Sequence, residues 1–179
     1  MEFPVGTHRI GPATASLRVH TTRTGAAAKA GHDLEIEVEL WKATLIVADD
    51  PAQTTVELTA DGNSLHVVEG HGGVSELGEE DKTNIKATID DEILRGEQVR
   101  FRSTQVTPNG TGLRVDGDLT LAGAVHPISF ELTTDGKGGI TANTVVTQTR
   151  WGIKPYATLF GTLKVGDDVQ ITLDGRLAD

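Results

Sequence analysis

The 179-residue chain has no cysteine and very few aromatic residues. The missing cysteine excludes disulfide bonds, thiolate nucleophiles and zinc sites built from cysteine. Aromatic residues make up only 4% of the chain, so any core or cavity must be built mainly from aliphatic side chains. No apolar stretch reaches the length of a transmembrane helix.

Positive charge is also scarce, because 16 Lys and Arg face 26 Asp and Glu and leave a net charge of −10. Without a basic excess to displace counterions, nucleic acid is not an expected partner. The same net charge should repel an anionic membrane surface. The first ten residues have no basic region followed by an apolar run. We therefore expect a cytoplasmic protein, with loss of a leader peptide as the alternative.

Motifs for catalysis, nucleotide binding and metal binding are missing as well. The chain has no Gly-x-Ser-x-Gly elbow and no glycine-rich phosphate loop after a strand. None of its six histidines lies in a HExxH pattern, and His66 with His71 forms only a weak candidate for a shared metal. We therefore predict no catalytic residue, no metal and no cofactor.

Alternation of apolar and polar residues is the main pattern that the chain does contain. Leu113 to Leu121 and Ile128 to Leu132 alternate on either side of a short break, which predicts a β-hairpin. Another alternating strand precedes Trp41, and one wet face is typical of an antiparallel sheet. We expect its aliphatic residues to point inward and its acids outward: Leu34, Ile36, Val38 and Leu40 against Glu35, Glu37 and Glu39.

Similar short strands recur about nine or ten times, separated by turns rich in glycine. This spacing predicts a single all-β domain over residues 1–179, either a sandwich or a barrel that leaves no open edges. One helix interrupts the pattern near residues 81–94, where Ile85, Ile89 and Ile93 recur every four residues. Such a helix must lie on the barrel, either as a movable lid or as a fixed plug.

Five segments in order along the chain resemble the YceI-like family, and especially its actinobacterial-type members. They are Gly31–Leu34, Lys82–Leu94, Gly117–Leu132 (GDLTLAGAVHPISFEL), Thr149–Ile153 and Gly166–Ile171. The resemblance implies an antiparallel lipocalin-like β-barrel of about eight or more strands around a lipid cavity. It also implies a long apolar ligand, such as a polyisoprenoid, an isoprenoid quinone or a fatty-acyl chain.

We therefore predict a binding protein whose partner is an apolar small molecule, and a homodimer remains open. The expected ligand-binding residues are His32, Leu34, Ile36, Val38, Phe101, Leu119, Phe130, Trp151, Tyr156 and Phe160. The aromatic segment near Trp151 could instead plug the base of the barrel. His32 could instead be tied to a backbone carbonyl.

Two other functions remain open. One is an enzyme that uses His32 and Asp33 as acid and base on a lipid-like substrate. The other is a stress-related barrel that interacts through its outer surface without a ligand.

Overall fold

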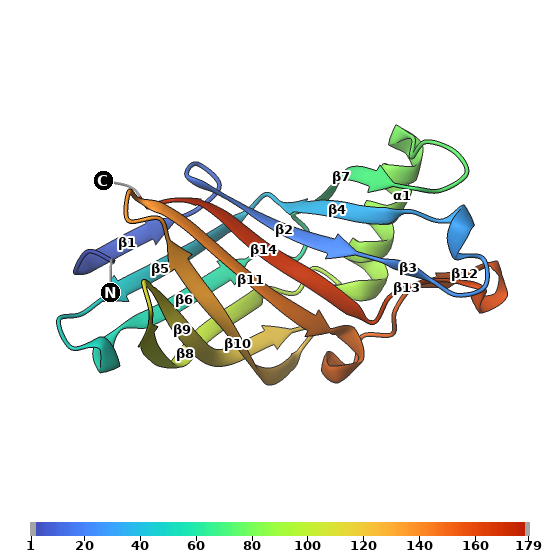
Figure 1. Cartoon of the computed structure of the whole chain (residues 1–179). Coiled ribbons are helices and arrows are strands. Elements are labelled where there is room, and N and C mark those ends of the chain that lie inside the picture. Colours follow the sequence, from blue (N-terminus) through green and yellow to red (C-terminus); the bar gives the residue numbers. More distant parts are fainter. Residues whose placement is uncertain (1–2, 178–179) are drawn as a thin grey trace.

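A computed structural model describes residues 3–177, and most of them lie in antiparallel strands (Figure 1). The strands are β1 (Gly6–Ile10), β2 (Ala15–Thr21), β3 (Arg23–Thr24), β4 (Asp33–Val38), β5 (Trp41–Val47), β6 (Thr55–Ala60), β7 (Leu65–His71), β8 (Val99–Asn109), β9 (Gly112–Leu121), β10 (Ala124–Thr134), β11 (Gly139–Thr147), β12 (Ala157–Thr158), β13 (Leu163–Val165) and β14 (Asp168–Arg176). The helical elements are η1 (Ala28–Ala30), η2 (Pro51–Gln53), α1 (Glu79–Thr88), η3 (Ile89–Ile93), η4 (Gln148–Trp151) and η5 (Leu159–Gly161).

Eleven strands form one strongly curled sheet in the order β1-β5-β6-β8-β9-β10-β11-β14-β2-β4-β7. A small second sheet, β12-β13-β3, projects beyond one end of the large one (Figure 1). Every neighbouring pair in both sheets is antiparallel. Within residues 3–177, no helix is long and apolar enough to cross a membrane.

The sheet closes on itself because pairs of hydrogen-bonded strands, called ribbons below, bend around corners. The β5–β6 ladder continues into the β4–β7 ladder, because Asp61 N–H donates to Leu40 O at 2.9 Å and Glu39 N–H donates to Ser64 O at 2.9 Å. In the same way, β1 pairs with β5 while β2 pairs with β4. The two ends of the strand order are therefore parts of the same ribbons. This confirms the predicted antiparallel lipocalin-like barrel.

The predicted hairpin is present as β9 and β10, which pair from Leu121 with Ala124 to Leu113 with Leu132. Leu113 and Val115 are completely buried on its inner face. A side chain at Gly117 would collide with the ring of Phe101, since an added Cβ would lie 2.5 Å from its Cζ. Glycine at this position thus lets an aromatic ring lie flat on the inner face of the barrel.

The alternation in β4 is largely confirmed. Ile36 and Val38 are buried, and Leu34 lines the interior. The prediction that Leu40 points inward is wrong, because this residue is 62% exposed. Strand β4 ends at Val38, and Leu40 lies in the turn that bends the ribbon toward β5. The twofold alternation of a strand ends where its ladder bends.

Glu35 and Glu37 project from the outer face of β4, where Arg18 of the neighbouring strand covers them. The Arg18 guanidinium pairs with both carboxylates, and its Nε lies 2.6 Å from Glu37 Oε2. Ser16 donates a further hydrogen bond to Glu37 at 2.9 Å. The hydrogen bond to Glu37 raises the pKa of Arg18 above its ordinary value. Cross-strand pairing thus relieves the repulsion between two glutamates on one face.

The predicted helix is present, and it begins at Glu79, two residues earlier than expected. The Gly78 N–H donates to Asp81 Oδ2 at 3.0 Å, which caps the first turn. The last turn is a wider π-helical turn, in which Leu94 N–H reaches back to Ile89 O at 2.9 Å. An α-helix has about 3.6 residues per turn, so residues spaced by four lie slightly more than one full turn apart and drift around the helix. The wider turn brings Ile93 back toward the face that carries Ile89.

That apolar face of the helix covers the barrel interior, as expected. Ile85, Ile89 and Ile93 are only half-buried and line the interior, whereas Leu94 is buried. Lys86 holds the helix to the barrel, because its Nζ lies 2.6 Å from Asn63 O and 3.3 Å from Leu65 O. The helix therefore rests on the barrel through few buried side chains.

We predict that Ile89→Ala costs less unfolding free energy than the ~2–5 kcal/mol that truncation of a closely packed Ile costs, because Ile89 borders open space. Leu113→Ala, in the close-packed wall, should cost about 2–5 kcal/mol. Urea unfolding of the two variants gives the comparison. If the helix is a lid, Ile89→Ala should also release a bound apolar probe faster. A loss equal to that of Leu113→Ala, with unchanged release, would show a fixed plug.

Candidate functional site

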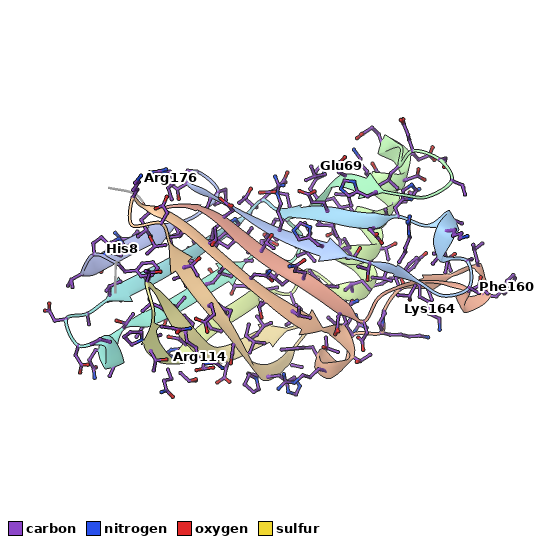
Figure 2. All side chains as sticks on the ribbon, viewed as in Figure 1. His8, Glu69, Arg114, Phe160, Lys164 and Arg176 are labelled. Atoms are coloured by element: carbon purple, nitrogen blue, oxygen red, sulfur yellow. The ribbon has the colours of Figure 1, made fainter. Side chains whose placement is uncertain are left out.

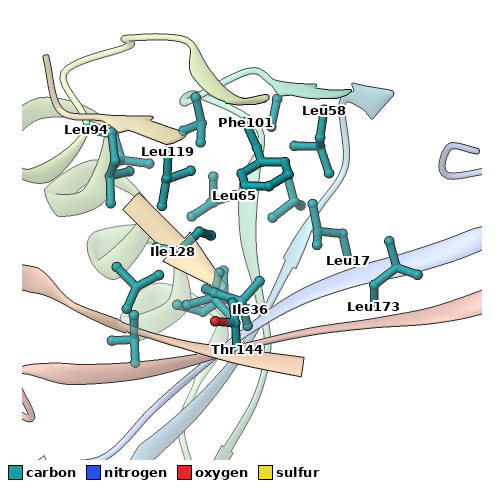
Figure 3. Close-up of a pocket in the computed structure, with 18 of the residues that line it drawn as sticks. Leu17, Ile36, Leu58, Leu65, Leu94, Phe101, Leu119, Ile128, Thr144 and Leu173 are labelled. Carbon is teal, nitrogen blue, oxygen red and sulfur yellow. The ribbon is translucent and has the colours of Figure 1, made fainter. Parts of the chain in front are cut away.

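The barrel encloses a cavity of about 420 Å³ (Figure 3). Aliphatic side chains point into it from most strands of the large sheet, as Leu17, Leu58, Leu119 and Leu173 show in the close-up. The rings of Phe101 and Phe130 lie in the same wall, with centroids 5.3 Å apart. Helix α1 and η3 cover part of this space. The barrel is therefore hollow and apolar inside.

The cavity wall carries no formal charge. Of residues 3–177, none that lines it is Asp, Glu, Lys, Arg or His. An ionised substrate or a general acid–base pair would have no charged partner there, and burying an unpaired charge in such surroundings is costly. The wall therefore suits a neutral, mostly hydrocarbon guest.

A few polar groups interrupt the apolar wall. Thr21, at the end of β2, is 9% exposed, and its hydroxyl finds no hydrogen-bond partner among the described residues. Gln148, at the end of β11, is buried and donates from Nε2 to Gly166 O at 2.9 Å. The Tyr156 side chain also lines the cavity. An unpaired buried hydroxyl is unfavourable, so this end of the cavity can receive one polar atom of a guest.

A second hollow of about 390 Å³ lies between η3 and residues 152–157. It shares Ile93, Leu94, Ile153 and Tyr156 with the wall of the main cavity. Its lining also includes charged groups, such as Glu92 and Lys154. These four residues thus separate the two spaces beside the helix, and their displacement would open a passage for a guest between solvent and the interior.

Seven of the ten residues predicted from the sequence line this cavity: Leu34, Ile36, Val38, Phe101, Leu119, Phe130 and Tyr156. Further residues line the cavity, such as Val19, Ile85 and Leu173. The alternation of the strands and the stripe of isoleucines on the helix would also have indicated that these side chains point inward. The sequence does not indicate that Thr21 and Gln148 line the cavity, because single polar residues near strand ends are common.

His32 lies outside the cavity wall. Its Nε2 is 2.7 Å from Ser75 O, so the ring is tied to a backbone carbonyl. The neighbouring Asp33 accepts a hydrogen bond from the Arg23 N–H at 2.8 Å. The two side chains thus hold loops together at the rim.

Trp151 and Phe160 also lie outside the wall, contrary to our expectation. Trp151 is buried, and its indole N–H donates to Leu119 O at 3.0 Å. The His126 ring packs edge-on against it, with centroids 5.3 Å apart. Phe160 is fully exposed at the tip of the projecting small sheet (Figure 2). Local sequence does not show on which side of the barrel wall such aromatics lie.

One group of potential metal ligands lies on the outer surface. Ligand atoms of Glu35, Glu69 and His71 are all within 4.8 Å of one another. Glu35 is already paired with Arg18. His66, the other half of the weak sequence candidate, is not in this group. Arg18 thus already provides a partner for the Glu35 carboxylate, and Glu69 and His71 are exposed.

The pKa shifts also belong to the outside of the barrel. The Ser129 hydroxyl donates to Asp116 and lowers the pKa of that carboxyl. The backbone N–H groups of Lys137 and Gly139 lower the pKa of Asp135 in a turn. Neither acid lines the cavity. These groups stabilise strands and turns on the outer surface of the barrel.

Solved structures of low sequence identity share this fold. The Burkholderia cenocepacia protein BcnA is 16% identical, with a TM-score of 0.65 over 92% of this chain and 96% of its own. A Campylobacter jejuni YCEI protein is 12% identical, with a TM-score of 0.55 over 80% of this chain and 84% of its own. A polyisoprenoid binding domain from Saccharophagus degradans, implicated in plant cell wall breakdown, is 8% identical, with a TM-score of 0.54 over 97% and 99%.

No curated protein sequence matches the chain. The YceI-like domain matches residues 9–177, from the end of β1 through β14, which includes every residue that lines the cavity. The chain therefore belongs to the YceI-like family.

Proposed function

We propose that this chain is a non-catalytic carrier, without a metal or cofactor, that holds a long apolar ligand inside its barrel. A polyisoprenoid, an isoprenoid quinone or a fatty-acyl chain fits this description. The observation that carries the proposal is the charge-free aliphatic cavity of about 420 Å³. Its volume lies within the range of about 300–1,000 Å³ that is usual for small-molecule sites.

Exclusion of water supplies enough free energy for such binding. A guest that buries about 300 Å² of apolar surface gains about 7.5 kcal/mol at about 25 cal/mol per Å², before the cost of association. A hydrocarbon chain needs no specific polar partner along its length. The description of the Saccharophagus degradans relative as a polyisoprenoid binding domain supports the same class of ligand.

The two alternative functions have less support. An enzyme based on His32 and Asp33 would need both side chains beside the guest, but they are bonded to Ser75 and Arg23 outside the cavity wall. A barrel that acts only through its surface would have no use for an open interior, because small barrels can fill the same space with side chains.

Organic extraction of the purified protein, followed by mass spectrometry, tests the proposal directly. We expect one apolar molecule per chain, or an empty protein that binds Nile red and releases it when geranylgeraniol is added. An empty protein that binds neither compound would favour the barrel without a ligand.

Ala142→Trp should block the cavity, since Ala142 lines it from β11. Val145→Trp adds the same indole to the same strand at a side chain that is 54% exposed, and it serves as the matched control. Losing about 60 Å² of ligand contact costs about 1.5 kcal/mol, a factor of about ten in affinity. Nile red titration should show this loss for Ala142→Trp alone. Equal affinities of the two variants would place the ligand elsewhere.

Thr21→Val removes the unpaired hydroxyl from the polar end of the cavity and keeps its shape. One hydrogen bond contributes about 0.5–1.5 kcal/mol, so binding of geranylgeraniol should weaken about threefold to tenfold. Squalene, a hydrocarbon, should bind the variant as tightly as the original protein. Competition against Nile red measures both. If the two compounds lose affinity equally, Thr21 does not contact the polar group of the ligand.

A further inference from the structure

The turn between β12 and β13 presents two large apolar side chains to solvent. Phe160 is fully exposed and Leu159 is 52% exposed. Figure 2 shows Phe160 at the far tip of the molecule, beyond the end of the barrel. The Phe160 side chain thus buries no surface within the fold, and Leu159 buries only part of its own.

The backbone of this tip is strained. Leu159, Phe160 and Gly161 all have positive φ, at 50°, 55° and 82°. A residue with a Cβ pays about 1–2 kcal/mol for that conformation, so glycine or asparagine would be favoured at the first two positions. Strain of this kind is concentrated at functional sites. The chain thus places Leu and Phe where the backbone conformation is unfavourable for both and where Phe160 gains no burial.

Positive charge gathers around the same tip. The small sheet brings residues 21–31 and 148–166 together, since Lys164 pairs with Thr24 and the Ala27 N–H donates to Thr162 O at 2.8 Å. These two segments contain five of the 16 Lys and Arg and none of the 26 acids. Among residues 3–177, the exposed Lys29 and Lys164 form no ion pair. In a strongly acidic chain, these two segments therefore carry only positive charges, of which Arg23 is paired with Asp33.

We propose that this tip docks on an anionic lipid bilayer, with Leu159 and Phe160 in the interface and Lys29 and Lys164 against the headgroups. Amphipathic surfaces bind bilayers through this combination of apolar burial and basic charge. The net charge of −10 does not prevent contact. At physiological salt, charges separated by more than about 8 Å are largely screened, so the charges at the tip dominate once it faces the bilayer.

The small sheet that carries this tip begins at residues of the cavity wall. Tyr156 and Val165, at the base of the small sheet, both line the cavity, and the Val165 N–H donates to Tyr156 O at 2.9 Å. Tyr156 also borders the second hollow beside η3. A docked tip would therefore hold this passage close to the bilayer. That use rests on the proposed lipid-carrier function, whereas docking itself needs no loaded cavity.

Vesicle flotation tests the docking with the full chain. We expect binding to vesicles of equal parts phosphatidylcholine and phosphatidylglycerol, weaker binding to phosphatidylcholine alone, and loss of binding in high salt. Phe160→Asn should weaken binding about tenfold, given the contribution of a buried Phe side chain. Its melting temperature should stay the same or rise, because asparagine tolerates positive φ.

Lys164→Glu should weaken binding to the anionic vesicles about fivefold or more, since each lysine near such a surface contributes to binding. Lys137→Glu makes the same change of charge at the other end of the barrel, where Arg176 donates to Lys137 O at 2.7 Å (Figure 2), and should bind like the original protein.

Unchanged flotation of Phe160→Asn, or no binding by the original protein, would overturn the proposal. So would self-association that Phe160→Asn abolishes without any vesicle binding, because the tip would then be a contact between copies. Nile red binding by the same variants shows whether the cavity function stands or fails independently.

Discussion

Closure of the barrel depends on bent ribbons, and in one of them β4 and β5 stay hydrogen-bonded to β7 and β6 around a corner. The bonds between Leu40 and Asp61 and between Glu39 and Ser64 carry the ladder through that corner. A sheet with unpaired edges is prone to association with other chains, and this ribbon pairs strands from both ends of the sheet order. The cavity exists because the ring closes without enough large side chains to fill it.

The same corner positions the helix. A side chain at Gly62 would collide with Glu97 O, in the segment that follows the helix. Lys86 of the helix donates to Asn63 O in the corner itself. Barrel closure and the cover of the cavity therefore meet at Asp61–Ser64. A substitution there should disturb both the strand pairing and the access to the interior, which links the stability of this protein to its proposed function.

The two ends of the molecule differ in chemistry, so a ligand of the proposed carrier would enter and leave at one end. At one end, a polar patch inside the wall, a passage beside η3 and a basic apolar tip lie together around Tyr156. The other end carries the turn at Lys137 and the Arg176 side chain (Figure 2). A guest that enters beside the helix would thus move between the cavity and whatever surface the tip contacts.

Residue patterns along the chain predict the class of the fold, the faces of its main strands and the apolar character of the interior. Alternation at Ile36 and Val38 predicts burial because neighbouring side chains on a strand point to opposite faces. The spacing of Ile85, Ile89 and Ile93 predicts a helix with one apolar stripe for a similar reason. The absence of the common catalytic and nucleotide-binding motifs also leaves most kinds of catalytic site without support in the sequence.

Long-range strand pairing makes the barrel hollow and brings residues together at its mouth, and neither result can be predicted from local sequence. Alternation assigns a side chain to a face, but the distance across the barrel depends on how distant strands pair and bend. Trp151 was therefore placed in the cavity from sequence and lies behind its wall, and Phe160 points away at a tip. Thr21 and Gln148 come together only because β2 and β11 lie on either side of β14, a proximity that depends on long-range pairing.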